Sequence, residues 1–420
     1  MREVDLAIIG GGSAGLSAAV SAYDAGIRSI VILEKGPFLG GILNQCIHNG
    51  FGLTEFKEEL TGPEFAARFI AKVKERNIEY HLNSSVSALT KDKVLSYMNP
   101  EEGAVKMHAK AIIMAAGCYE RSAGAIAIPG DRPAGILTAG QAQKFLNEQG
   151  YMVGKRVFIL GSGDIGLIMA RRMTLEGAKV LGVAELCAWS NGLNRNMVQC
   201  LYDYNIPLYL SHTVSKVEGK GRLQKVTISQ VDERKQPIPG TEKVFDCDTL
   251  ILSIGLLPNN DLLNNLGIPQ GRSRGSEVNE RLETAVPGIF SCGNVLHVHD
   301  LVDNVVEEAR VAGKSAAEYI LNNAKEEKED IKVVAGNMIG YVVPSYVSSK
   351  GEDKATFKFR VREPSKNVYI VYELNGKVVK KVFKSVIIPS EMEIESLPKT
   401  LFNGESGTLT VSLVKKEEVK

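Results

Sequence analysis

Residues 6–15 read Leu6-Ala7-Ile8-Ile9-Gly10-Gly11-Gly12-Ser13-Ala14-Gly15, and residues 157–166 read Val157-Phe158-Ile159-Leu160-Gly161-Ser162-Gly163-Asp164-Ile165-Gly166. Each segment runs from a short apolar strand into a glycine-rich turn that opens a helical stretch. An acidic residue stands 24 positions after the first glycine in both copies, Glu34 after Gly10 and Glu185 after Gly161. This order is typical of a dinucleotide-binding turn. Two copies in register therefore predict two such sites in one chain.

The three glycines of each run have separate physical roles. The first permits a tight turn, the second lets backbone amides approach a pyrophosphate, and the third allows the helix to pack closely on the strand. They are Gly10, Gly12 and Gly15 in the first run and Gly161, Gly163 and Gly166 in the second. The helix N-terminus faces the phosphates, and the carboxylate can accept hydrogen bonds from an adenosine ribose. The alternative is that each turn only relieves packing.

The composition is that of a large globular protein with balanced charge. A length of 420 residues suggests two to four domains, and 50 basic against 49 acidic side chains give no argument for binding nucleic acid. The six cysteines form no CxxC pair, which argues against a disulfide framework and is typical of a reducing cytosol. The first strand begins at Val4, which leaves no room for a signal peptide, and no apolar run could span a bilayer. We expect a cytoplasmic protein without membrane insertion.

The order of segments predicts an α/β fold with two Rossmann-like dinucleotide-binding domains, the first of them discontinuous. The first domain comprises residues 1–120 and 281–324, because the later segment contains no third glycine fingerprint and returns to complete it. The second domain comprises residues 134–259 and repeats the plan of the first. Each unit closes on an apolar strand that ends in a glycine, Gly117 and Gly255.

A charged run at residues 325–330 marks a further boundary, and the nucleotide-binding domains are expected to be complete before it. Beyond it, residues 331–420 show the apolar and polar alternation of strands at 356–361 and 368–373, with Asn375-Gly376 as a hairpin turn. We expect a C-terminal β-sandwich-like domain. Because it contains no catalytic constellation, an assembly role is its simplest use.

These motifs resemble those of the two-dinucleotide-binding-domain flavoproteins, which include thioredoxin and glutathione reductases, over about three-quarters of the chain. The resemblance implies that the first glycine turn holds FAD and the second holds NAD(P)H. It also implies that Ala115-Ala116-Gly117 lies against the flavin nucleotide and that residues 287–294 reach its ribityl chain. Asn294 stands where the family usually has Asp, but an amide can still hydrogen-bond a hydroxyl. The dithiol pair of disulfide reductases is absent, which argues against an ordinary disulfide reductase.

Motifs and resemblance together give the predicted cofactor-binding residues. Those for FAD are Gly10, Gly12, Ser13, Ala14, Gly15, Glu34, Lys35, Gly41, Ala116, Gly117, Gly293 and Asn294. Those for the nicotinamide nucleotide are Gly161, Gly163, Asp164, Ile165, Gly166, Glu185 and Gly255. Glu185 favours NAD over NADP, because its carboxylate would repel the additional phosphate. Arg195 is the nearest residue that could reverse this preference.

A narrower resemblance is carried by residues 40–52, 135–141 and 389–392. They look like segments of the FAD/NAD(P)-binding subunits that accompany sarcosine, opine, proline or glycerol-3-phosphate dehydrogenases. This resemblance implies a diaphorase role, in which a partner dehydrogenase subunit oxidises the organic substrate and this chain exchanges electrons with a nicotinamide nucleotide. We expect the partner to be contacted partly through residues 331–420.

Hydride transfer between nicotinamide and flavin needs no protein acid or nucleophile, because the cofactors carry the chemistry. The loop at 44–51 should turn toward the isoalloxazine, which makes Cys46 and His48 the catalytic candidates. Cys46 is either a redox thiol or a packed side chain, and His48 either tunes a flavin nitrogen or bonds its own loop. Two alternatives to the diaphorase remain: a stand-alone thiol or disulfide reductase that uses Cys46, and a nucleotide-binding structural subunit that moves no hydride.

A dense polar cluster follows Asn294. It contains His297, His299, Asp300 and Asp303. The spacing fits no common ligand pattern, so no metal site is predicted. The next helix carries Glu307, Glu308 and Arg310, which we expect on a solvated or partner-facing surface.

Overall fold

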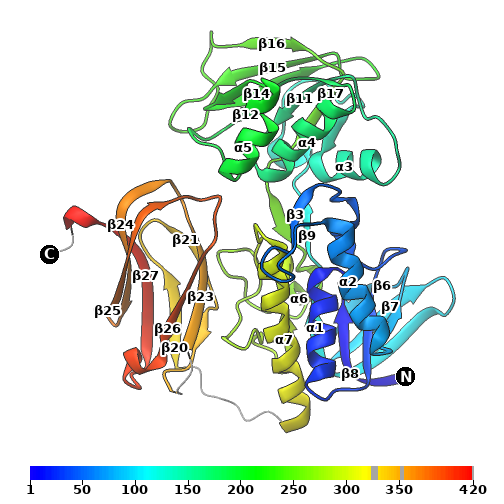
Figure 1. Cartoon of the computed structure of the whole chain (residues 1–420), viewed down its shortest axis with the longest axis vertical. Helices are drawn as coiled ribbons and strands as arrows, with labels where there is room; N and C mark the ends of the chain where they lie inside the picture. The colour runs from blue at the N-terminus through cyan, green and yellow to red at the C-terminus, as the bar shows by residue number, and fades with distance from the viewer. Residues whose placement is uncertain (323–329, 351–353, 419–420) are drawn as a thin grey trace. The chain divides into compact units, whose positions relative to one another are not determined.

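The computed structural model describes residues 1–322, 330–350 and 354–418 (Figure 1). Contacts divide it into two compact units, one of residues 1–118 and 258–420 and one of residues 119–257. The charged run expected as a boundary lies outside the described residues except for Asp330. Because the division keeps residues 331–420 with the first unit, the domain boundaries drawn from the sequence stay predictions.

A seven-stranded sheet carries the first glycine turn. Its order is β5-β2-β1-β8-β7-β6, and β19 also pairs with β8. The strands are β1 (Arg2–Ile9), β2 (Ile30–Leu33), β5 (Glu79–His81), β6 (Ser85–Leu89), β7 (Val94–Asn99), β8 (Gly103–Met114) and β19 (Ile289–Ser291). The strands β5, β2, β1, β8 and β19 pair in parallel, and β2 is buried at every residue. Continuous apolar strands of this kind are covered on both faces.

Helices pack against this sheet, and they come from both of the sequence segments that form the first unit. They are α1 (Ser13–Asp24), α2 (Gly62–Glu75), α7 (Val302–Asn322) and the short α6 (Asp261–Asn264). Thr61 and Glu64 form a capping box that begins α2. In Figure 1, α7 lies beside α1 and packs against it. β19 pairs with β8, and α7 packs against α1 and β8. The chain therefore returns to the first sheet after the second unit, as the sequence predicts.

The second unit repeats the strand, glycine turn and helix plan. A parallel sheet has the order β10-β17-β11-β12-β13, and an antiparallel sheet has the order β14-β15-β16. The parallel strands are β10 (Ile136–Thr138), β11 (Arg156–Leu160), β12 (Lys179–Glu185), β13 (Leu208–Leu210) and β17 (Thr249–Leu252). The antiparallel strands are β14 (His212–Glu218), β15 (Lys225–Gln230) and β16 (Lys243–Asp246). The helices are α3 (Ala139–Asn147), α4 (Asp164–Leu175) and α5 (Asn194–Cys200).

The C-terminal residues form two sheets that enclose an apolar core, in the orders β22-β20-β27-β24-β25 and β21-β23-β26. The first sheet contains β20 (Ile331–Ala335), β22 (Tyr346–Val347), β24 (Ser365–Leu374), β25 (Lys377–Ile387) and β27 (Gly407–Lys415). The second contains β21 (Ile339–Val343), β23 (Lys354–Val361) and β26 (Glu393–Pro398). Asn375 and Gly376 join β24 to β25 with positive φ angles of 52° and 80°, as the predicted hairpin turn requires.

Two further pairs of short strands complete the described structure. They are β3 (Asn49–Phe51) with β4 (Leu60–Thr61), and β9 (Cys118–Glu120) with β18 (Leu256–Pro258). The chain passes between the two units within β9 and β18. Among the described residues, no helix combines the length and the apolar character that crossing a membrane requires.

The close approach of α1 to β1 gives a test of the fold. A Cβ at Gly15 would overlap the carbonyl oxygen of Gly10, whereas a Cβ at Gly12 would have its nearest neighbour 3.9 Å away. We expect Gly15→Ala to destabilise the apoprotein by about 1–3 kcal/mol, because backbone must move to admit the methyl group. Thermal unfolding of the two variants measures this. Gly12→Ala is the matched control, and equal melting temperatures for both would contradict the packing account.

Candidate cofactor sites

The first glycine turn is shaped by backbone contacts that exclude side chains. Gly10 has a φ of 111°, and a Cβ there would overlap the carbonyl group of Ala115. Gly12 differs, because its φ is −78° and the nearest atom to a Cβ would be Gly41 Cα at 3.9 Å. The protein's own packing therefore does not require glycine at position 12. The space it leaves fits a ligand group that approaches the backbone closely, such as a pyrophosphate.

The N-terminus of α1 has the electrostatics that such a group needs. Gly12 is the N-cap and supplies no side-chain cap, and the first turn contains no acidic residue. The first amide groups of the helix thus keep their positive partial charge available to an anion. The residues present fit the phosphate groups of a dinucleotide.

Glu34 follows β2 and bonds back to the glycine turn. Its Oε2 accepts a hydrogen bond from Gly11 N at 2.7 Å, and its Oε1 accepts one from Gly36 N at 2.7 Å. The residue is 9% exposed. Two backbone bonds leave further lone pairs on the carboxylate, which can accept ribose hydroxyls. Lys35, predicted beside it, is exposed.

The second turn reproduces this geometry. Glu185 Oε2 accepts from Ser162 N at 2.9 Å, and its Oε1 accepts from Cys187 N at 2.9 Å. Ser162 Oγ adds a third bond to Oε2, at 2.6 Å. Gly161 has a φ of 98°, and a Cβ at Gly166 would lie 2.7 Å from the carbonyl oxygen of Gly161. The duplication seen in the sequence thus extends to individual hydrogen bonds.

The structure gathers the other residues predicted for the first site around the turn. Gly41 lies against Gly12, since a Cβ on Gly41 would be 3.0 Å from Gly12 Cα. Gly293 lies against Ala14, with a distance of 2.8 Å from a Cβ there to the Ala14 Cβ. Ser13 begins α1, and Ala116 and Gly117 follow the Ala115 carbonyl that contacts Gly10. Their binding roles stay predictions.

The residues predicted for the second site are less uniform. Asp164 Oδ1 accepts from Leu193 N at 2.8 Å and from Asn196 Nδ2 at 2.6 Å, so this carboxylate holds a neighbouring segment. Ile165 lies in the first turn of α4, whose N-cap is Gly163. Gly255 is exposed, with a φ of 100°. The proximity of Asp164 and Gly255 to a bound nucleotide stays a prediction.

Cys46 and His48 lie on the loop between the 3₁₀ turn at 41–45 and β3. The Cys46 thiol donates to the carbonyl oxygen of Ile42 at 3.3 Å. The His48 ring lies 3.1 Å, through Nδ1, from the carbonyl oxygen of Asn49 and 5.0 Å, between centroids, from Phe51. These contacts are local to the loop. The redox role of Cys46 and the flavin-tuning role of His48 are predictions that they leave open.

The thiols elsewhere differ in environment. Asn294 Nδ2 donates to Cys118 Sγ at 3.7 Å, which joins the segments predicted to face the flavin. Burial raises the pKa of Cys200 to about 11 and that of Cys247 to about 12. Because the thiolate is the reactive form, these two thiols are inert at neutral pH.

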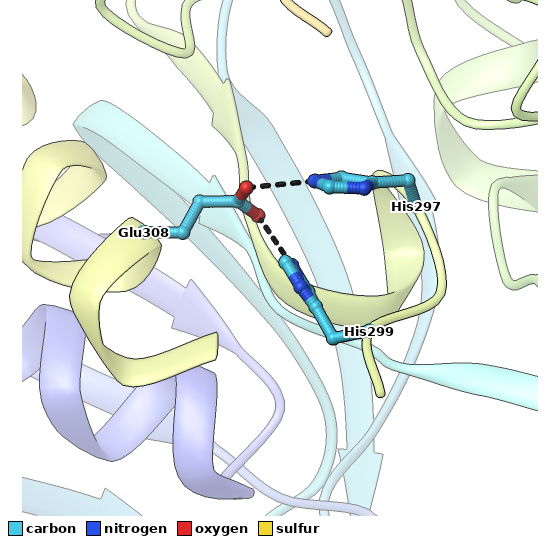
Figure 2. Close-up of side chains that lie close together, drawn as sticks. All are labelled: His297, His299 and Glu308. Atoms are coloured by element: carbon cyan, nitrogen blue, oxygen red, sulfur yellow. Dashed lines mark hydrogen bonds and ion pairs between the residues drawn. The ribbon is translucent and has the colours of Figure 1, made fainter. Parts of the chain in front are cut away.

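Glu308 is not on the surface, and the expectation from the sequence is wrong. Its side chain is 2% exposed and faces those of His297 and His299, which lie next to each other (Figure 2). Oε1 accepts from Gly293 N at 2.8 Å and pairs with His299 Nε2 at 3.2 Å. Oε2 pairs with His297 Nε2 at 2.8 Å and accepts from Lys358 Nζ at 2.9 Å. An amphipathic pattern could have found it, since Glu308 shares a helix face with the buried Val305 and Ala312.

His297, His299 and Glu308 could geometrically hold a metal ion, because their ligand atoms lie within 4.8 Å of one another. However, each carboxylate oxygen of Glu308 already has two partners, and one of the partners of Oε2 is the ammonium group of Lys358. A carboxylate offers about four lone-pair positions, and all are used. The arrangement therefore favours an ion-pair network over a metal centre.

Charge in this network is set by burial and by neighbours. Burial opposes the charged form of Glu308, yet Lys358 and the two histidines hold its pKa well below the usual range. Burial, with His297 nearby, lowers the pKa of His299 well below its ordinary value, so His299 is neutral. Since an ionised carboxylate only accepts hydrogen bonds, both histidines present an N–H at Nε2.

Asp303 is a second buried carboxylate that sequence reasoning did not assign. Oδ1 accepts from Thr54 N at 3.0 Å and from Glu55 N at 2.7 Å, and Oδ2 accepts from Gly52 N at 3.2 Å. The N-terminus of α7 thereby fixes the loop that continues from β3. Only its position in a dense polar cluster indicated a role.

Comparisons with known proteins agree with this geometry. Residues 4–316 match the family described as pyridine nucleotide-disulphide oxidoreductase. The thioredoxin reductase of Bacillus subtilis is 26% identical over 339 residues, which cover 79% of this chain and 98% of that protein. The crystal structure of T. acidophilum thioredoxin reductase aligns with a TM-score of 0.62 and 22% identity, covering 76% of this chain and 99% of that one.

A relative of a different kind is the hydrogen cyanide synthase subunit HcnB of Pseudomonas protegens. It is 26% identical over 282 residues, which cover 62% of this chain and 58% of HcnB. The match thus spans less than two thirds of that relative. Since the family match covers most of the chain and includes both glycine turns, the protein belongs to the pyridine nucleotide-disulphide oxidoreductase family and is an FAD-dependent oxidoreductase that uses a nicotinamide nucleotide.

Proposed function

We propose that this chain is a diaphorase-type electron-transfer subunit that exchanges hydride between NAD(H) and FAD. In this proposal a partner dehydrogenase subunit oxidises the organic substrate, for which glycerol-3-phosphate and an amino acid are the candidates. The observation that carries the proposal is the repeated turn, in which Glu34 and Glu185 make the same backbone bonds in two units. Such a chain is equipped for two dinucleotides.

Some of these residues would bind the two cofactors, and Glu185 would also disfavour NADP. FAD supplies the hydride-accepting ring when it is bound, and the protein supplies alignment. The first turn of α1 and Gly12 would hold the FAD pyrophosphate, and Glu34 its adenosine ribose. Glu185 would accept the ribose hydroxyls of NAD and would repel the phosphate of NADP.

A subunit role is supported by two observations. One relative is by name a subunit of hydrogen cyanide synthase. The chain also continues past the family match, which ends at residue 316, into a β domain. Partner contact through residues 331–420 is part of the proposal.

A stand-alone thiol or disulfide reductase remains the second candidate. The relationship to thioredoxin reductase over 98% of that protein favours it as much as the diaphorase. Against it, the six cysteines form no CxxC pair and no disulfide. Family membership supports an enzyme and so disfavours the third candidate, a structural subunit without hydride transfer.

Replacing Glu185 tests the choice of nicotinamide nucleotide. Glu185→Gln keeps an acceptor for Ser162 N but removes the charge, so we expect the ratio of kcat/KM for NADH over NADPH to fall by about tenfold or more. Stopped-flow reduction of the flavin by each nucleotide measures the ratio. Equal rates with both nucleotides in the wild type would refute the assignment to NAD.

Replacing Cys46 separates the two leading functions. We expect Cys46→Ser to keep NADH:dye turnover within about threefold of the wild type, since flavin-mediated transfer needs no thiol. Dye reduction and reduction of a small disulfide are measured side by side, with Cys200→Ser as the control for a thiol deep in the second unit. A loss of disulfide reduction in Cys46→Ser, with FAD and dye turnover retained, would favour the thiol reductase.

The subunit role predicts a stable complex. A tag on this chain in its native host should co-purify a second polypeptide, and that complex should oxidise an organic substrate with reduction of NAD. Adding the separated partner alone to substrate and NAD should give no NADH. Reduction of NAD by the organic substrate with the partner alone, or with this chain alone, would contradict the subunit role.

A further inference from the structure

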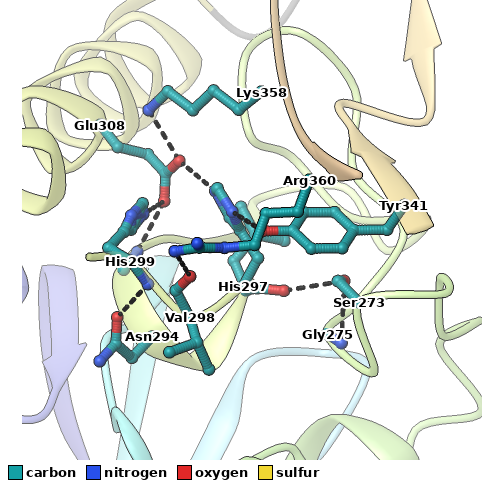
Figure 3. A network of polar contacts seen from close by, with 12 residues as sticks. Ser273, Gly275, Asn294, His297, Val298, His299, Glu308, Tyr341, Lys358 and Arg360 are labelled. Carbon is teal, nitrogen blue, oxygen red and sulfur yellow. Dashed lines mark hydrogen bonds and ion pairs between the residues drawn. The ribbon is translucent and has the colours of Figure 1, made fainter. Parts of the chain in front are cut away.

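Two basic side chains of the C-terminal domain, Lys358 and Arg360, donate hydrogen bonds to the segment that follows the turn Gly293-Asn294. Phe357 and Phe359 on β23 are buried in the core between the two C-terminal sheets, so the alternate residues Lys358 and Arg360 point to the other face. Lys358 Nζ donates to Glu308 Oε2 at 2.9 Å. Figure 3 shows both cations beside Val298, His299 and Glu308.

Arg360 contacts the backbone of the same segment through its guanidinium group. It donates from one guanidinium nitrogen to the carbonyl oxygen of Val298 at 3.4 Å and from another to that of Ser390 at 2.7 Å. Tyr341 on β21 adds a contact of 3.3 Å between its hydroxyl oxygen and His297 Nδ1. The polar face of β21 and β23 thus holds residues 297–308.

Glu308 connects Lys358 to the turn Gly293-Asn294 through hydrogen bonds. It accepts from Gly293 N at 2.8 Å, and Asn294 Oδ1 accepts from His299 N at 3.0 Å. Gly293 in turn lies against Ala14 at the beginning of α1. Lys358 is therefore two hydrogen bonds away from the turn predicted to reach the flavin.

The charge of Lys358 compensates the charge of the buried Glu308 carboxylate. Among the described residues, Lys358 is the one lysine or arginine paired with Glu308. The carboxylate is 2% exposed, and the lysine side chain is 12% exposed. A buried carboxylate that loses its cation is left uncompensated, so the charged side chain is drawn toward water. This movement takes the acceptor away from Gly293 N.

The C-terminal domain has further contacts with the rest of the first unit. Val343 belongs to the same apolar core as α1 and α7. Ser345 N donates to the carbonyl oxygen of Val278 at 2.8 Å, and Lys399 Nζ donates to Glu280 Oε1 at 2.8 Å. The domain thus contacts the rest of the first unit at residues other than Glu308.

We infer that the C-terminal domain is a working part of the flavin site, in which Lys358 acts through Glu308 to position the turn Gly293-Asn294 against FAD. Lys358 and Glu308 are positioning residues and touch no reacting atom. The inference rests on the proposed placement of FAD at this turn. It replaces the expectation that the nucleotide-binding domains are complete before residue 325.

The test is a set of three variants of the full chain, each measured by FAD titration of the apoprotein. Lys358→Met is expected to raise the FAD dissociation constant by about tenfold. Lys354→Met, at the exposed beginning of the same strand, is expected to match the wild type. The double variant Glu308→Gln with Lys358→Met is expected to return to within about threefold of the wild type, because a neutral amide still accepts from Gly293 N.

Rescue by the second substitution distinguishes positioning through charge from loss of packing, because both variants have the same methionine. Wild-type affinity in Lys358→Met, or a double variant as weak as the single one, would overturn the inference. Should Lys358→Met fail to fold, a folded double variant with near wild-type affinity supports the inference, and a weak one overturns it. A wild type that binds no FAD would also refute the proposed function, whereas normal binding in all variants would refute the inference alone.

Discussion

The bond between a strand-tip carboxylate and the backbone of a glycine turn is the constraint on which both nucleotide-binding units depend. Gly11 N donates to Glu34, and Ser162 N donates to Glu185, at 2.7 and 2.9 Å. Each bond ties the end of the second strand to the turn that begins the helix. The carboxylate is thereby oriented before any ligand arrives, and a preorganised acceptor loses less entropy on binding.

The second constraint is electrostatic and connects parts of the chain far apart in sequence. Glu308 is buried with Lys358, 50 residues later, and with the amide of Gly293. A buried pair of this kind is weak evidence for stability, but the loss of either partner alone is costly, because the other is then left as an unpaired buried charge. The C-terminal domain therefore contributes more than a surface. It supplies the cation that a carboxylate beside the predicted flavin turn requires.

The sequence predicted what depends on local geometry. The roles of Gly10 and Gly15 follow from a turn and a close helix–strand approach, and the hairpin at Asn375 follows from positive φ angles. Glu308 was misplaced because a charged pair on a helix looks solvated unless its long-range partner is known. Lys358 lies between two core phenylalanines, and nothing local indicates what its other face contacts. The surroundings of Cys46 depend on a loop whose course the sequence pattern does not specify.

In the proposed function, electrons move between nicotinamide and flavin without a protein disulfide as an intermediate. Anaerobic titration of the purified flavoprotein with NADH, followed by flavin absorbance, tests it most directly. NADH carries two electrons and FAD accepts two, so the account predicts complete bleaching at one equivalent of NADH per flavin, with no new thiols afterwards. Bleaching that is complete only near two equivalents, with thiols released, would show a second redox centre and contradict the account.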